Sequence, residues 1–548
     1  MRSGGARRLR LGVLCAALAA GAGEAGAQAP LYDLLIRGGT VVDGTGAARF
    51  RADVAVRGGR IARVSRTAIP AARARRVVDA RGMVVAPGFV DLHAHLDPLL
   101  RLPGAESMAR QGVTTALGGP DGGSPLPLGS YLDSAQALGL GINVAFLVGH
   151  NDVRQRVMGM EARAPRAAEL DRMRAEVARA MAEGAWGLST GLKYLPGAYS
   201  NTDEVVALAA VAADSGGIYT SHLREEGLGL VEAVAEAIRI GREGRIPVVL
   251  THHKAVGKPM WGASVRTLAM VDSARRAGVD VMVDQYPYTA TYTGIGVLVP
   301  AWARAGGDSA FERRLADPAL RDSIRGGVVF NILNDRGGGE LSRVQLARVP
   351  WMQELEGKTL ADWAALRGLD PTPENGADLV LEATRRGGTS AIYHVLDDGD
   401  VRRIMRHPQT MIASDGRLTQ PGEGHPHPRW YGTFPRVLGR YVRDERVLTL
   451  EEAVHKMTAL PAARLGLAGR GRVAAGMQAD LVVFDPLVVA DRATFQAPHQ
   501  YPAGIHHVFV GGTATVDAGR FTDARPGRVL RRPAGRTRAA HAPRARGR

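Results

Sequence analysis

The chain has 548 residues, of which 45% are hydrophobic and 23% are charged. These proportions are ordinary for a folded globular protein and exclude a fibre, a wholly disordered chain and a multi-pass membrane protein. The formal charge of +16 is concentrated at the ends: residues 1–27 hold four Arg and one Glu, residues 525–548 hold nine Arg and no acid, and the remainder carries only +4. Because that remainder has no basic stripe interleaved with aromatic residues, we expect no nucleic-acid binding.

Residues 1–27 have the pattern of a secretory signal peptide. Four Arg precede the apolar run LGVLCAALAAGAG at 11–23, and Ala25-Gly26-Ala27 forms a small-residue cleavage site. The run is shorter than the roughly 20 apolar residues that span a bilayer. We therefore expect an exported protein, periplasmic or secreted, with no transmembrane span after cleavage. An uncleaved membrane anchor is the alternative.

The only cysteine, Cys15, lies inside this segment. After cleavage the mature chain has no thiol, which excludes a disulfide, a cysteine nucleophile and a thiolate metal ligand.

Both ends of the remaining chain are rich in short β-type segments. Residues 31–86 contain β-branched runs separated by Gly-Gly and Asp-Gly-Thr-Gly turns, and residues 466–524 repeat this style. We expect the two flanks to form one small β-sandwich. The Pro/Gly/Ala/Arg-rich stretch 525–548 is predicted to be a disordered basic tail.

The middle of the chain, 87–465, alternates apolar runs with amphipathic helical segments. Eight such runs in this order are typical of a parallel (β/α)8 barrel of the TIM type, in the α/β class. A charged stretch at about 300–405, before the last run, is predicted to be an inserted subdomain or lid. The eight runs are 86–93, 113–119, 143–150, 185–190, 216–222, 247–253, 280–286 and 409–415.

Ligand-type side chains stand at the ends of four of these runs. His93 and His95 alternate on the first run and therefore project to the same face. His222, His252 and Asp415 end the fifth, sixth and eighth runs. Barrel active sites are built at the carboxyl ends of the strands, so these five side chains are expected to meet at one rim and bind a divalent metal.

The order of these residues, between two halves of a β-domain, resembles the amidohydrolase superfamily. More narrowly, segments in this order are similar to the D-aminoacylase (N-acyl-D-amino-acid deacylase) family, over nearly the whole chain from about 31 to 532. The segments are APGFVDLHAHLD, GVTTALGGPDGGS, LVGHNDVR, LSTGLKYLPGAYS, SHLREEG, THHK, DQYPYTA, ASDG, HPHPRWYGTFPRVLGRY and YPAGIHHVFVGG.

The resemblance implies a zinc site with one or two divalent ions. His93, His95 and Asp415 would surround one position, and His222 and His252 would hold the tighter one.

The chain departs from the family at one further ligand. Family members often supply a cysteine after the second strand, where this chain has Asp121. A carboxylate is a competent zinc ligand, so Asp121 is the candidate replacement, with a simple turn residue as the alternative. Other superfamily members use a carboxylated lysine at the fourth strand. Lys193 is the only lysine near that place, and a solvated loop residue is the favoured interpretation.

The predicted activity is hydrolysis of a linear amide bond, with Asp415 accepting the proton of water and returning it to the leaving nitrogen. A free carboxylate on the substrate needs cationic or hydroxyl partners beyond the strand ends. The candidates are Lys254, Tyr194, Arg224 and Tyr288.

The substrate class implied by the resemblance is an N-acyl-D-amino acid. The alternatives are a dipeptidase for D-configured dipeptides, a cyclic amidase of the dihydroorotase or hydantoinase type, and a metal-free binding protein.

Overall fold

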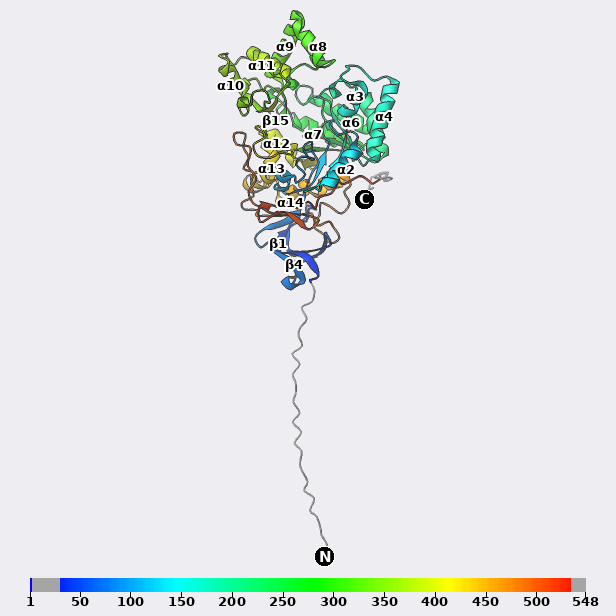
Figure 1. Ribbon diagram of the computed structural model, residues 1–548, viewed down its shortest axis with the longest axis vertical. Coiled ribbons are helices and arrows are strands. Elements are labelled where there is room, and N and C mark those ends of the chain that lie inside the picture. Colours follow the sequence, from blue (N-terminus) through cyan, green and yellow to red (C-terminus); the bar gives the residue numbers. More distant parts are fainter. Residues whose placement is uncertain (2–29, 534–548) are drawn as a thin grey trace.

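The computed structural model describes Met1 and residues 30–533 (Figure 1). Most of the predicted signal peptide and residues 534–548 of the predicted tail therefore lie outside the described residues. Within the described part of the chain, no helix is both long enough and apolar enough to cross a lipid bilayer.

Parallel strands at eight positions form a closed barrel, as the sequence predicts. They pair in chain order, and β19 closes the ring by pairing with β7. Every residue of β8, β11, β12, β13 and β14 is buried, which explains their continuous apolar character. The strands are β6 (Phe89–Asp91) with β7 (Ala94–His95), β8 (Val113–Gly118), β9 (Asn143–Phe146) with β10 (Val148–Gly149), β11 (Gly187–Gly191), β12 (Ile218–His222), β13 (Val248–Leu250), β14 (Val281–Gln285), and β18 (Thr410–Ile412) with β19 (Gly416–Arg417).

Helices cover the outside of the barrel. In α6 the buried residues recur every three or four positions, so one face packs on the strands while the charged face meets solvent. The covering helices are α1 (Glu106–Ala109), α2 (Leu128–Leu138), α3 (His150–Met158), α4 (Ala167–Ala182), α5 (Thr202–Asp214), α6 (Leu230–Glu243), α7 (Ser264–Arg276), α12 (Asp398–Arg406), α13 (Arg429–Arg436), α14 (Leu450–Met457) and α15 (Ala459–Leu465).

Both chain ends build the β-domain at the bottom of Figure 1. Strand β5 of the N-terminal flank pairs antiparallel with β20 of the C-terminal flank, so hydrogen bonds join all nine strands into one sheet. Side chains from both flanks, such as Val54, Leu481 and Phe509, share one core. The strands are β1 (Tyr32–Val41), β2 (Phe50–Arg57), β3 (Arg60–Ser65), β4 (Ala74–Asp79), β5 (Val84–Pro87), β20 (Leu481–Phe484), β21 (Ile505–Val510), β22 (Thr513–Asp517) and β23 (Arg520–Phe521).

An inserted subdomain lies at the opposite end of the molecule, at the top of Figure 1. It has its own antiparallel sheet, in the order β15-β17-β16, and its own apolar core. Its elements are β15 (Thr291–Gly294), α8 (Asp308–Ala316), α9 (Pro318–Asn334), β16 (Val344–Arg348), α10 (Leu360–Leu366), α11 (Pro373–Arg385) and β17 (Ser390–Tyr393).

The limits of this insertion differ from the predicted 300–405. It begins at β15, a polar strand without an apolar run, which hid it in the sequence. At the other end, α12 packs on α7, β14 and β18 and so belongs to the barrel. Because its sequence, DGDVRRIMR, is highly charged, this barrel helix was predicted to be part of the insertion.

The segment 525–533 corrects the prediction that the disordered tail starts at 525. The Trp186 indole N–H donates to the Leu530 carbonyl at 2.5 Å, and Gly527 and Val529 form β-bridges with residues of the barrel. Val529 and Leu530 are partly buried against the core. These apolar residues are the reason that an Arg-rich stretch packs on the barrel.

Deleting residues 526–548 should therefore lower the free energy of unfolding by about 2–4 kcal/mol, because several hydrogen bonds worth about 1 kcal/mol each are lost. Deleting 534–548 leaves every one of these contacts in place and serves as the control. Denaturant unfolding of both truncations measures the difference, and equal stabilities would show that the contacts of residues 526–533 contribute nothing.

Candidate metal centre

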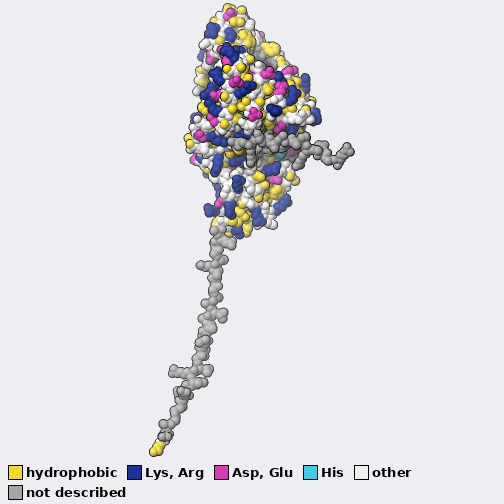
Figure 2. Space-filling model, turned by 90° about the vertical axis from the view of Figure 1, so that its right-hand side faces the viewer, with side chains coloured by type: hydrophobic (Ala, Val, Ile, Leu, Met, Phe, Trp, Pro, Cys, Tyr) yellow, Lys and Arg dark blue, Asp and Glu magenta, His cyan; other side chains and the backbone are white. Residues whose placement is uncertain are grey.

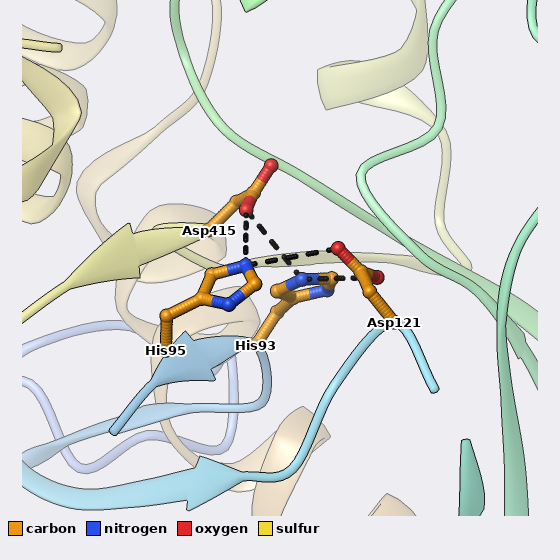
Figure 3. Close-up of side chains that lie close together, drawn as sticks. All are labelled: His93, His95, Asp121 and Asp415. Carbon is orange, nitrogen blue, oxygen red and sulfur yellow. Dashed lines mark hydrogen bonds and ion pairs between the residues drawn. The ribbon is translucent and has the colours of Figure 1, made fainter. Parts of the chain in front are cut away.

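The six residues predicted to bind metal converge at the carboxyl-terminal rim of the barrel, in a cavity of about 350 Å³. They come from five different strand ends, and Figure 3 shows four of them facing one another. Two groups have ligand atoms that all lie within 4.8 Å of one another. The first is His93, His95, Asp121 and Asp415, and the second is Asp121, His222 and His252.

Asp415 and Asp121 close the first group from two sides. Asp415 Oδ1 lies 3.1 Å from His95 Nε2 and 3.5 Å from His93 Nε2. Asp121 Oδ1 lies 3.4 Å from His93 Nε2 on the other side. Two imidazole nitrogens and two carboxylates thus point into one small space.

Asp121 also belongs to the second group. Its Oδ1 lies 3.5 Å from His252 Nε2, and its Oδ2 lies 3.8 Å from His222 Nδ1. The two facing imidazole nitrogens are themselves only 2.8 Å apart. Asp121 is therefore shared by both groups and is placed to bridge two metal positions.

The backbone holds three of these residues in the left-handed region, with φ of 54° at Asp121, 37° at His252 and 47° at Asp415. Hydrogen bonds fix two of them: the His252 N–H donates to Asp284 Oδ1 at 2.6 Å, and the Asp415 N–H donates to the His93 carbonyl at 2.9 Å. Such conformations cost free energy and persist only where the surroundings enforce them, which is typical of functional sites.

A cation fits the residues present. His93 Nε2 and Asp121 Oδ1 are buried without a hydrogen-bond partner among the described residues, although both face the centre of the cluster. Buried acceptors without partners are costly, and an ion between them would satisfy both. The donor set of imidazole nitrogen and carboxylate oxygen matches zinc and related divalent ions.

The titration of the paired histidines shows how strongly the cluster attracts positive charge. Burial and the neighbouring Lys254 oppose protonation of His252, yet Asp121 and Glu226 outweigh them and raise its pKa to about 9. Burial lowers the pKa of His222 to about 4. The acidic neighbours of His252 thus favour positive charge at this place, which a metal ion would supply.

Asp415 is held in its ionised form. Burial alone would raise the pKa of this carboxyl, but Arg429, whose Nη2 lies 3.0 Å from Asp415 Oδ2, and His93 keep it well below its usual range. Asp415 is therefore a carboxylate at neutral pH, able to accept a proton.

A second layer of buried charge supports the histidines. Glu226 Oε1 lies 3.1 Å from His252 Nδ1, and Glu226 accepts hydrogen bonds from Lys254 and from Arg336 of the insertion. Burial would raise the pKa of Glu226, but Lys254, His222 and Arg336 hold it well below its usual range. The inserted subdomain thus contributes a guanidinium that helps to fix the metal-facing rings.

Two of the four predicted substrate-binding residues line the cavity and two do not. Lys254 and Tyr194 line it, and the Tyr194 ring centre lies 4.4 Å from that of His222. Arg224 instead makes a two-point ion pair with Glu236 at 2.9 and 2.8 Å, away from the cavity.

Tyr288, which was predicted to bind substrate, also lies outside the cavity lining. Its hydroxyl donates to Asp491 Oδ2 at 3.4 Å. Tyr286, directly after β14, lines the cavity in its place. Lys193 Nζ lies 2.7 Å from Glu225, and Lys193 is not among the residues that line the cavity.

The sequence reasoning missed further residues that line the cavity. Glu226 lies in the segment SHLREEG and Arg429 lies in the segment HPHPRWYG. The signal that could have identified them is a charged residue in a segment expected to be buried. Arg336 lies in the insertion, and nothing in the sequence indicates that this loop reaches the rim. The cavity-lining residues without an earlier assignment include Tyr286, Glu226, Arg336, Arg417, Arg429, Tyr292 and Trp430.

A metal-binding cluster at the rim of a (β/α)8 barrel, flanked by a β-domain from both chain ends, is the architecture of a metal-dependent hydrolase. The sequence matches the amidohydrolase family over residues 76–298 and 336–516, and the chain belongs to this family.

The chain is 41% identical to the N-acyl-D-glutamate deacylase of Alcaligenes xylosoxydans xylosoxydans, with 92% of this chain and 97% of that protein covered. It is 40% identical to the D-aminoacylase of the same organism, with 92% and 98% covered. A solved structure of N-acyl-D-glutamate deacylase from Bordetella bronchiseptica, complexed with zinc and a phosphonate inhibitor that mimics the tetrahedral intermediate, is 38% identical. The structural match covers 91% of this chain and 99% of the Bordetella bronchiseptica chain, with a TM-score of 0.77. A D-hydantoinase structure, at 14% identity and a TM-score of 0.54, shares the fold alone.

Replacing Asp121 with Ala should remove metal from both groups, because its two oxygens face both. We expect less than half of the wild-type zinc content after dialysis, measured by elemental analysis. Asp97→Ala is the matched control, since Asp97 lines the same cavity but lies outside both groups. Wild-type zinc content in Asp121→Ala would reduce this residue to a turn aspartate.

Replacing Glu226 with Gln should weaken zinc binding by about 10–100-fold, the usual effect of losing a carboxylate that orients a ligating histidine. Competition with a chromogenic chelator measures the affinity. Glu225→Gln changes the neighbouring acid, which pairs with Lys193, and should leave the affinity unaltered. Equal affinities in the two variants would contradict a role of Glu226 in orienting His252.

Proposed function

We propose that this protein is a zinc-dependent amidohydrolase that deacylates N-acyl-D-amino acids to a D-amino acid and a carboxylate. The observation that carries the proposal is the cluster of four imidazoles and two carboxylates in the rim cavity. The similarity over more than 90% of the chain to an N-acyl-D-glutamate deacylase and a D-aminoacylase supports the substrate class.

The chain supplies ligands for one or two divalent ions. Asp121 would contribute to both positions, with His93, His95 and Asp415 on one side and His222 and His252 on the other. When bound, such an ion supplies Lewis-acid chemistry, because it polarises an amide carbonyl and lowers the pKa of water.

Asp415 performs the proton transfers. Its Oδ1 faces the histidines of the cluster, and the carboxyl is ionised, so it accepts the proton of the attacking water. The same proton is then delivered to the amide nitrogen. This second transfer is required because an amine anion is a very poor leaving group, and Arg429 keeps the carboxylate in place through its contact with Oδ2.

The α-carboxylate of the substrate has cationic partners close to the reacting centre. Lys254 Nζ lies 2.6 Å from His252 Nδ1, and Arg429 touches Asp415. Both cations are buried, with exposed fractions of 7% and 2%, and a carboxylate is bound most strongly where water is excluded. Tyr286 and Tyr194 add hydroxyls and apolar ring surface to the same cavity.

Two other hydrolytic activities are compatible with this cluster, a dipeptidase for D-configured dipeptides and a cyclic amidase. A dipeptidase would cut the same kind of linear amide, so a substrate comparison separates it. The geometry favours a linear amidase over the cyclic amidase, because Lys193, the candidate for a carboxylated bridging lysine, pairs with Glu225 and does not line the cavity.

We also propose that the protein is exported, to the periplasm or beyond. The support is the Arg-rich start, the apolar run and the A-x-A site within residues 1–27, together with the lack of cysteine from residue 28 onward. N-terminal sequencing of the mature protein after cell fractionation tests this proposal, and a cytoplasmic protein that retains residues 1–27 would refute it.

The Asp415→Asn variant should lose at least about a hundredfold in kcat, the scale of a general acid–base contribution, while still binding zinc at the His222 and His252 group. The assay is release of D-amino acid from paired N-acetyl-D- and N-acetyl-L-amino acids and D-configured dipeptides, with added zinc. Wild-type turnover in Asp415→Asn would refute the proton-transfer role. Preference for dipeptides or for L substrates would refute the deacylase assignment.

A further inference from the structure

Four Lys or Arg side chains line the cavity, and three of them are already paired. Lys254 and Arg336 both bind Glu226, and Arg429 binds Asp415. The fourth, Arg417, lines the same cavity. Within residues 30–533 its guanidinium makes no ion pair and no hydrogen bond.

Arg417 is positioned by the barrel itself. It lies on β19, two residues after Asp415, and its register partner on β7 is His95. It is only partly exposed and shares the cavity wall with Tyr292 and Trp430, whose rings meet edge to face at 5.1 Å. A guanidinium in a cavity wall without a carboxylate partner is suited to bind an anion with two parallel hydrogen bonds.

The α-carboxylate is not the best partner for Arg417. In an N-acyl-amino acid, the carbon of this carboxylate is about 2.5 Å from the scissile nitrogen, as the bond lengths require. It must therefore lie beside the metal-binding cluster, where Lys254 contacts His252 and Arg429 contacts Asp415. Arg417 makes no polar contact with any cluster side chain, so it suits a group several bonds further along the substrate.

We propose that Arg417 binds a second carboxylate of the substrate, which makes the preferred substrates dicarboxylic N-acyl-D-amino acids. This inference rests on the proposed deacylase function. The second carboxylate can be carried by the side chain, as in D-glutamate or D-aspartate derivatives, or by the acyl group, as in a succinyl amide. Both present the same chemistry to Arg417.

The test compares matched pairs of substrates in the zinc-loaded full-length enzyme. N-acetyl-D-glutamate and N-acetyl-D-glutamine differ only in the side-chain charge, and N-succinyl-D-leucine and N-butanoyl-D-leucine differ in a carboxylate on the acyl group. The variants are Arg417→Gln and Arg417→Lys. Arg101→Gln is the control, because Arg101 pairs with Glu423 at the surface and lies outside the cavity.

In Arg417→Gln we expect kcat/KM for one charged substrate to fall by about 10–100-fold, the scale of a hydrogen-bonded ion pair. The matched neutral substrate should change by less than about threefold, and Arg417→Lys should restore part of the loss. The pair that shows the loss identifies which end of the substrate carries the second carboxylate. Equal losses on charged and neutral substrates, or no loss on either charged substrate, would overturn the proposal.

Failure of the deacylase assignment would look different, since the wild type would then hydrolyse none of the four compounds. In that case calorimetric binding of the same four compounds to the unreactive protein still tests Arg417. Tighter binding of a charged compound than its neutral partner, lost in Arg417→Gln but not in Arg101→Gln, supports the anion site. Equal binding in wild type and Arg417→Gln refutes it.

Discussion

The rest of the site depends on one electrostatic constraint, the burial of two ionised carboxylates at the rim of the barrel. Asp121 and Asp415 are only 10% and 8% exposed, yet both hold pKa values below the ordinary range. Carboxylates removed from water are stable only beside positive charge. Arg429 provides part of this charge beside Asp415, and a divalent ion held by the ligand atoms would supply the rest.

The same constraint explains the arrangement of the surrounding residues. Glu226 balances Lys254 and Arg336, and it orients His252 at the same time. Because Arg336 is only 2% exposed and comes from the insertion, the subdomain is part of the electrostatic support of the rim. Outside the cavity the charges are mixed rather than concentrated: on the face in Figure 2, Lys and Arg are interspersed with Asp and Glu.

The barrel and the six converging residues could be predicted because local signals carry them. Parallel strands buried on both faces give continuous apolar runs, and ligand-type residues that follow such runs must meet at one rim. The wrong predictions concern side chains whose orientation the local sequence does not determine. Tyr286 and Tyr288 both follow a strand end, so the sequence allows either one to line the cavity. Only the packing of the folded chain directs Tyr288 toward Asp491 and leaves Tyr286 in the cavity wall.

Long-range contacts were the other limit of prediction. Arg224 looked like a substrate-binding cation, but its partner Glu236 lies in a helix whose position relative to the rim no local pattern gives. Likewise, both limits of the insertion were predicted wrongly, because strand β15 is polar and helix α12 is highly charged. The Arg-rich composition near 525 hid Val529 and Leu530, which pack against the barrel.

Asp121, which follows the second barrel strand, brings two possible ligand oxygens to the cluster. A carboxylate has two oxygens, and here Oδ1 faces His93 and His252 while Oδ2 faces His95 and His222, at 3.4–3.8 Å. Asp121 would therefore serve both groups of ligands without oxidisable sulfur. Thiolates are lost to oxidation where no reducing system protects them, so a site built only from imidazole and carboxylate suits a protein proposed to work outside the cytoplasm. The absence of cysteine from residue 28 onward fits the same explanation.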